Sequence, residues 1–80
     1  MAIVHQEDGF TFNIEASFQG PPYVYVTKGK GFIICRIGDP QTGLPHVEEF
    51  KRVKKDDVDF AYNIVRTYQE KFSSVWERIH

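Results

Sequence analysis

The spacing of apolar residues changes once along this chain, from a period of two to a helical period. From Phe10 to Phe18 every second residue is apolar, and the residues between them are Thr, Asn, Glu and Ser. One face of such a strand is apolar and the other faces water. Residues 56–80 contain no glycine or proline, and their apolar residues recur at helical spacing. Strands therefore come first and a helix last, which is the order of an α+β fold.

Turn residues divide the first part of the chain into strands. Residues 2–6 are expected to form a short strand, and Asp8-Gly9 is expected to turn it into the strand that begins at Phe10. Residues 23–27 alternate Tyr and Val before a Lys-Gly turn. Residues 32–37 are almost all apolar, which predicts a central strand covered on both faces.

Residues 44–53 follow a further turn and fit either a fourth strand or a helix, because Val47, Phe50 and Val53 have helical spacing. Phe60 lies on the side of the predicted helix away from its apolar stripe. It is expected to cover this segment around Phe50 and Val53, and the alternative is an exposed anchor for a partner.

Residues 56–80 are expected to form one long helix. Asp56 is a natural N-cap, and Asp57 and Asp59 add negative charge where the helix dipole favours it. The apolar stripe of that helix consists of Val58, Ala61, Tyr62, Val65, Tyr68, Phe72, Val75, Trp76 and Ile79. The predicted fold is α+β, an antiparallel sheet of three to five strands with one long C-terminal helix packed on one face.

The length of 80 residues predicts a single domain over residues 1–80. Hydrophobic residues make up 41% and charged residues 26%, which is typical of a folded globular chain. No apolar run approaches the roughly 20 residues of a membrane span, and the first residues lack the pattern of a signal peptide. The single Cys35 excludes an internal disulfide. We therefore expect a cytoplasmic protein without a membrane partner.

The residues that most often carry chemistry are sparse. His5, His46 and His80 have no metal-pair spacing, so neither a metal, a cofactor nor a catalytic residue is predicted. Cys35 lies among isoleucines and is expected to be buried and inert. Residues 28–31, Lys-Gly-Lys-Gly, join two strands and so lack the context of a phosphate loop. The remaining enzymatic hypothesis is a small ribonuclease that uses His46, with Arg36 or a lysine as electrostatic support.

Positive charge is concentrated in the middle of the chain. Residues 21–55 hold seven basic and three acidic residues, a net charge of +4, while the whole chain has −1. The basic residues are Lys28, Lys30, Arg36, Lys51, Arg52, Lys54 and Lys55. A basic segment is typical of a polyanion partner such as nucleic acid, and equally of a solvated protein surface.

Tyr23 and Tyr25 lie two residues apart and so share one face of their strand. If Val24 and Val26 face the helix, both rings stand on the open face, with lysines just beyond them. Such a pattern fits a protein-binding patch, a stacking surface for single-stranded nucleic acid, or ordinary cross-strand packing.

Several short motifs resemble a family of small bacterial proteins of unknown function. They are Met1-Ala-Ile, Gly9-Phe-Thr-Phe, Gly20-Pro-Pro-Tyr-Val-Tyr-Val, and Val75-Trp-Glu in the final helix. Members usually have Pro-Pro-His-x-His-Val at the central motif. They are often encoded beside another small protein, as in toxin–antitoxin pairs.

The family's two histidines correspond to Tyr23 and Tyr25 here. Histidines so placed could bind a metal or transfer protons. Tyrosine, with a reference pKa of about 10, is a poor base at neutral pH. The resemblance therefore implies that this chain keeps a binding role without histidine chemistry.

These observations predict a small interaction module, part of a toxin–antitoxin-like or phage-related pair, that binds a protein through an aromatic and basic sheet face. The predicted binding residues are Tyr23, Tyr25 and the seven basic residues of residues 21–55. A nucleic-acid-binding protein that uses residues 28–55 is the alternative. A homodimer that pairs by sheet edges or faces is also compatible with the sequence.

Overall fold

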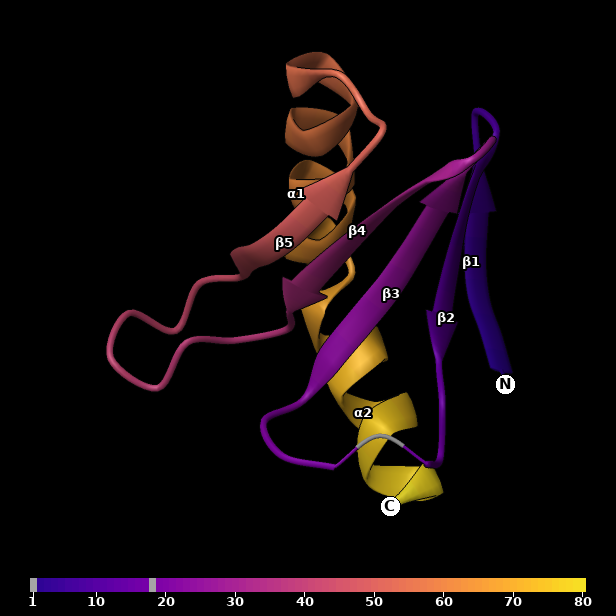
Figure 1. The fold of residues 1–80 in the computed structure, drawn as a ribbon. Helices are drawn as coiled ribbons and strands as arrows, with labels where there is room; N and C mark the ends of the chain where they lie inside the picture. The colour runs from indigo at the N-terminus through magenta and orange to yellow at the C-terminus, as the bar shows by residue number, and fades with distance from the viewer. Residues whose placement is uncertain (1, 18) are drawn as a thin grey trace.

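The fold is a five-stranded antiparallel sheet with two helices on one of its faces (Figure 1). The computed structural model describes residues 2–17 and 19–80. The elements are β1 (Ala2–Glu7), β2 (Phe10–Ile14), β3 (Tyr23–Lys28), β4 (Gly31–Arg36), β5 (His46–Lys51), α1 (Lys55–Thr67) and α2 (Gln69–Ile79). The predicted α+β class, with strands first and helical structure last, is confirmed.

Each strand pairs with the next one along the chain, in the order β1-β2-β3-β4-β5. The predicted Asp8-Gly9 turn is confirmed, and both residues have positive φ, 50° and 84°. The second strand is shorter than predicted, because it ends at Ile14 and residues 16–17 already form a turn. The predicted end of that strand, Phe18, lies outside the described residues.

Residues 46–51, left open between strand and helix, form the edge strand β5. The reason is pairing with β4, which extends from Phe32 opposite Lys51 to Arg36 opposite His46. The helical spacing of Val47, Phe50 and Val53 is not that of a buried helix face. Phe50 is 53% exposed at the edge of the sheet.

The prediction of one long helix is wrong, since the helical segment is interrupted at Tyr68. No glycine or proline causes the break. Tyr68 packs its ring against His5, with centroids 4.6 Å apart. Gln69 Nε2 donates to the carbonyl oxygens of Ile37 (2.9 Å) and Gly43 (2.8 Å), which fixes the start of α2 to the β4–β5 loop. These tertiary contacts set the direction of α2.

The interruption also changes which helix residues are buried. Ile64, absent from the predicted stripe, is buried, and Tyr62, a predicted member, lies outside the core cluster. The prediction for Phe60 is also corrected: its ring packs on Phe10 of β2, with centroids 4.7 Å apart, while Phe50 stays exposed. The predicted apolar stripe assumed one continuous helix. Because α1 and α2 turn different faces toward the sheet, one stripe cannot describe both helices, which explains these errors.

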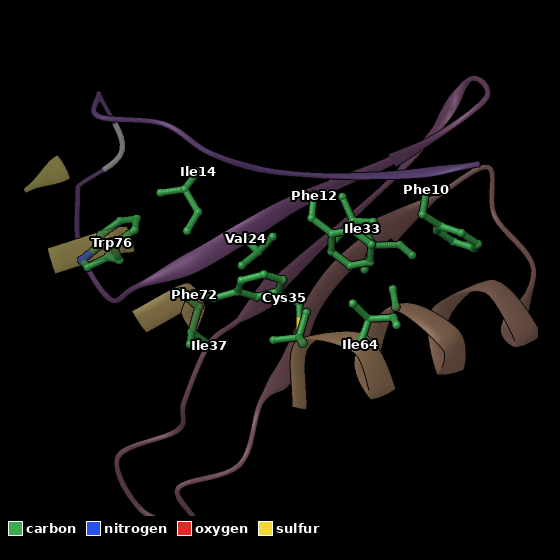
Figure 2. Packing of buried hydrophobic residues seen from close by; sticks show 13 residues of the cluster. Phe10, Phe12, Ile14, Val24, Ile33, Cys35, Ile37, Ile64, Phe72 and Trp76 are labelled. Carbon is green, nitrogen blue, oxygen red and sulfur yellow. The ribbon is translucent and has the colours of Figure 1, made fainter. Parts of the chain in front are cut away.

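The core fills the space between the helices and the inner face of the sheet (Figure 2). Its largest fully buried side chains include Phe12 from β2 and Phe72 from α2, whose ring centroids are 6.0 Å apart. Cys35 is fully buried in this layer, as predicted, and burial raises its pKa to about 12. The thiol is therefore protonated and unreactive at neutral pH.

The strand predicted to be covered on both faces, β4, is covered on one. Ile33 and Cys35 are buried beneath the helices, whereas Phe32 and Ile34 on the opposite face are half-buried. The apolar composition of β4 thus exceeds what the described helices can cover.

An ion pair joins the β3–β4 hairpin to the start of α1. Lys28 Nζ donates to Asp57 Oδ1 at 2.8 Å and lies 4.6 Å from the centre of the Phe10 ring. Asp57 Oδ2 accepts a hydrogen bond from the Lys54 backbone N–H at 3.0 Å. Lys54, not the predicted Asp56, is the N-cap residue, and Asp57 satisfies its N–H.

The Asp57 pair makes stability depend on pH. The hydrogen bond from Lys28, followed by that from the Lys54 N–H, lowers the pKa of Asp57. A lowered folded pKa contributes stability above the unfolded value of about 3.9 and loses it as pH falls through the folded value. We expect D57N to lower the urea midpoint at about pH 7, with the difference from wild type shrinking as the pH falls below about 3.9.

Asp56 supplies the control for this experiment, because it is an exposed acid of the same helical turn. D56N should shift the midpoint less at pH 7. A difference between D57N and wild type that persists unchanged at pH 2 would contradict the assignment.

Candidate interaction surface

The face of the sheet opposite the helices carries three rows of side chains, and strand register defines them. The first row runs Gln6, Thr11, Thr27, Phe32, Lys51; the second Ile3, Asn13, Tyr25, Ile34, Glu49; the third Tyr23, Arg36, His46. Glu48, the bulge residue between the second and third rows, reaches Arg36 on the same face. We call these residues the open face. Both helices lie on the other side (Figures 1 and 2).

Apolar side chains gather at the centre of the open face. Tyr25 stacks on Phe32, with ring centroids 5.7 Å apart and planes 15° apart. Ile34 is the cross-strand partner of Tyr25, and Ile3 is 59% exposed. Four such side chains on one uncovered sheet face are typical of a surface that binds another molecule.

Tyr23 differs from Tyr25, although both are half-buried. The β2–β3 pairing ends at Asn13 opposite Tyr25, so no β2 residue pairs with Tyr23. Its ring lies 5.9 Å from that of Trp76 on α2. Burial, and then the negative charge of Glu15, raise the pKa of Tyr23. Tyr25 therefore belongs to the centre of the open face, while Tyr23 links its border to the helix.

A hollow lies beside Tyr23 on the open face. It has a volume of about 260 Å³ and is lined by Pro21, Tyr23, Ile34, Arg36 and Glu48. Arg36 Nε donates to Glu48 Oε1 at 2.7 Å, and the two side chains are 31% and 37% exposed. The hollow is large enough for a partner side chain to enter, with apolar walls and a charged pair at its border.

The open face is aromatic but not basic, which corrects the predicted aromatic and basic sheet face. Its charges are Arg36 and Lys51 against Glu48 and Glu49, so they sum to zero. Lys28 lies on the helix side, bonded to Asp57. Of the seven predicted basic binding residues, the open face therefore contains two.

The other basic residues gather at one end of the sheet, around the β3–β4 turn and the start of α1. A side chain at Gly31 would collide with the Arg52 carbonyl oxygen and the Val53 side chain, so this turn lies directly beside the segment between β5 and α1. The residues at this end are Lys28, Lys30, Arg52, Lys54 and Lys55, and the acidic Asp56, Asp57 and Asp59 follow directly in α1. The acids offset much of the positive charge there.

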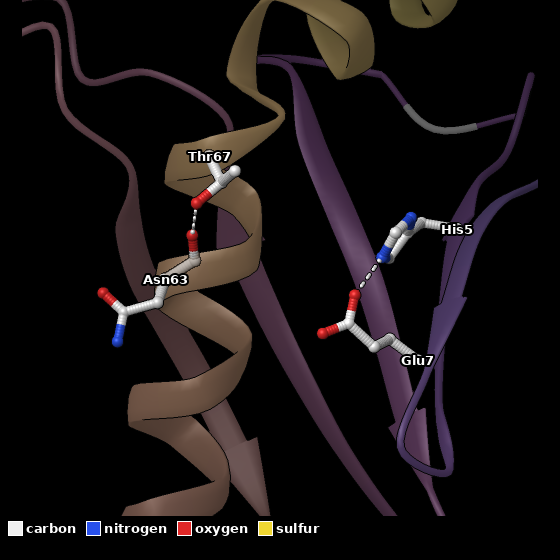
Figure 3. A network of polar contacts seen from close by, with 4 residues as sticks. All are labelled: His5, Glu7, Asn63 and Thr67. Carbon is white, nitrogen blue, oxygen red and sulfur yellow. Dashed lines mark hydrogen bonds and ion pairs between the residues drawn. The ribbon is translucent and has the colours of Figure 1, made fainter.

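The three histidines lie apart. His46 is exposed and is the register partner of Arg36, whose Nε is bonded to Glu48. His5 lies on the helix side, where its Nε2 is 3.0 Å from Glu7 Oε1 (Figure 3). His80 stacks on Trp76, with ring centroids 3.7 Å apart. Across residues 2–17 and 19–80, no three metal-ligating side chains form a group that could hold an ion.

Comparisons with family models, curated proteins and solved structures find no match to this chain. Within the described part of the chain, neither helix has the length and apolar character needed to cross a bilayer. The open face is therefore the feature from which a function is inferred.

Three residues of this surface were not predicted from the sequence: Ile3, Phe32 and Ile34. The signal was present in β4, because residues two apart share a face and Ile34 lies opposite Tyr25. Assigning β4 to a core covered on both sides hid that signal. The membership of Ile3 depends on strand register, which the sequence does not supply.

Asn13 is an unusual residue at the middle of the open face. It is 3% exposed, and its Nδ2 donates to the Tyr25 carbonyl oxygen at a long 3.4 Å. Its Oδ1 is buried and accepts no hydrogen bond from any described residue. An unsatisfied buried acceptor destabilises a fold by about 1–3 kcal/mol, so the fold does not require this amide.

Replacing Asn13 with a similarly sized apolar residue should stabilise the protein. We expect N13V to raise the free energy of unfolding by about 1 kcal/mol, because it removes the unsatisfied acceptor and suits a strand. Chemical denaturation measures the change. T11V, on the same strand and face, controls for simply adding an apolar group, and a loss of stability in N13V alone would contradict the interpretation.

Proposed function

We propose that this chain is an interaction module that binds a protein through the open face. The observation that carries the proposal is the group of Ile3, Tyr25, Phe32 and Ile34 on a sheet face that carries neither helix. Interfaces commonly combine an apolar and aromatic centre with a polar border. Here Arg36 and Glu48 stand at that border, beside a hollow for a partner side chain.

Charge favours a protein over nucleic acid as the partner. A surface that holds phosphates needs an excess of positive charge. The open face has equal numbers of positive and negative side chains, and at the basic end Lys28 is already paired with Asp57. Nucleic-acid binding is therefore the alternative outcome of the test below.

The resemblance to small bacterial proteins that occur in two-gene pairs suggests a setting for this module. Within the proposal, the Pro-Pro-Tyr-Val-Tyr-Val segment leads into the open face through Pro21, Tyr23 and Tyr25. A substitution of histidine by tyrosine there removes basic side chains but keeps aromatic contact area. Binding, and not catalysis, is the activity that these residues support.

The test is capture of partners from the native host by the tagged protein, with and without nuclease. We expect a stoichiometric protein that survives nuclease, and loss of at least about 30-fold in its capture by I34D, because a charge is buried at the centre of the interface. N63D, an exposed site on α1, introduces the same charge away from the open face.

The fold of I34D is checked by its denaturation midpoint and circular dichroism. Capture that I34D and N63D retain equally would place binding on another surface. Loss of all captured material after nuclease, with binding that weakens steeply as salt rises, would instead favour nucleic acid.

A further inference from the structure

We infer that the protein bound by the open face is a second copy of this chain, packed face to face across a two-fold axis. This inference rests on the proposed function and names its partner. The resulting assembly would have two sheets between two pairs of helices.

The apolar composition of β4 favours a partner on the open face. A strand that is apolar on both sides is typical of a sheet covered on both faces. The helices bury Ile33 and Cys35, while Phe32 and Ile34 point to the open face. A second identical sheet would cover this second side with an equally apolar surface.

The sheet edges are less suited to pairing than the face. The register of edge strand β1 is irregular between Ile3 and His5, and that of β5 is irregular opposite Ile34 and Cys35. Strand β5 also carries Glu48, Glu49 and Lys51. Bulges and charged side chains are common devices that prevent edge-to-edge association.

The charges of the open face are complementary to themselves under one two-fold axis. An axis that crosses the strands over the second row exchanges the first and third rows. It then brings Lys51 of one copy toward the Glu48 carboxylate of the other, beside the in-register His46, and places Phe32 over Arg36. The first contact is an ion pair and the second a cation–π contact, and each forms twice.

The central row meets itself in this arrangement. Tyr25 and Ile34 of one copy pack on Tyr25 and Ile34 of the other, so the apolar centre is buried on both sides. Glu49, at the exposed end of that row, meets its own copy. This repulsion at the border weakens the dimer slightly. Removing the Glu49 charge should therefore strengthen a dimer that uses this axis.

The size of the sheet limits the area that a face-to-face dimer can bury. Five strands about 4.8 Å apart and about six residues of about 3.3 Å each make a face of about 480 Å². Two such faces bury about 1,000 Å², which is at the lower limit for a specific interface. Interfaces near this limit are mostly weak or transient, so we expect monomer and dimer to exchange with concentration.

Sedimentation equilibrium from about 1 μM to about 1 mM tests the inference. Wild type should approach twice the 9.3 kDa of one chain at high concentration. I34D should remain monomeric, and N63D should associate like wild type. Because removal of the repulsion between the Glu49 side chains strengthens the dimer, E49Q should associate about two- to fivefold more tightly.

Mixing two charge variants tests the axis. K51E alone places two acids opposite each other, and E48K alone two lysines, so each should dimerise more weakly than wild type. An equimolar mixture should recover association, because both contacts between positions 48 and 51 in the mixed dimer then join opposite charges. Mixing that recovers nothing would overturn this axis.

Wild type that remains at 9.3 kDa throughout would overturn the inference. Association that I34D and E49Q leave unchanged would do the same, because the dimer would then use another surface. A monomeric wild type that still captures a different protein, with loss in I34D, would leave the proposed function standing. A monomer that captures nothing would remove both.

Discussion

The helices meet the sheet through one layer of large side chains, with Phe12 and Phe72 in contact near its middle. That layer determines most of the architecture. Strands β2, β3 and β4 each place alternate residues into it, and α1 and α2 close it from one side. Both described helices lie on the same face of the sheet. The described residues therefore leave the opposite face open.

The one-sided core explains why the open face has its particular composition. Alternation along the strands puts Tyr25 and Ile34 opposite the core residues Val24, Val26 and Ile33. Polar side chains on that face would be enough for a monomer, yet aromatic and branched side chains occupy its centre. Residues that do not serve the fold are the ones most expected to serve binding.

The start of each helix is held by contacts between residues distant in the chain. Lys28 and Asp57 tie the β3–β4 hairpin to the start of α1, and Gln69 ties the β4–β5 loop to the start of α2. These contacts keep the helices on one side of the sheet. They also place the Lys28 ammonium beside a carboxylate on the helix side of the sheet.

The sequence by itself determined the order of strands and helices, the α+β class, the burial of Cys35 and the apolar character of both sides of β4. Periodicity and turn residues reflect interactions among a few neighbouring residues, so these features can be predicted from the sequence. Only the tertiary structure decided the break at Tyr68, the burial of Ile64, the pairing of Lys28 with Asp57 and the membership of the open face. Each of these depends on strand register or helix–sheet packing, which bring together residues far apart in the chain.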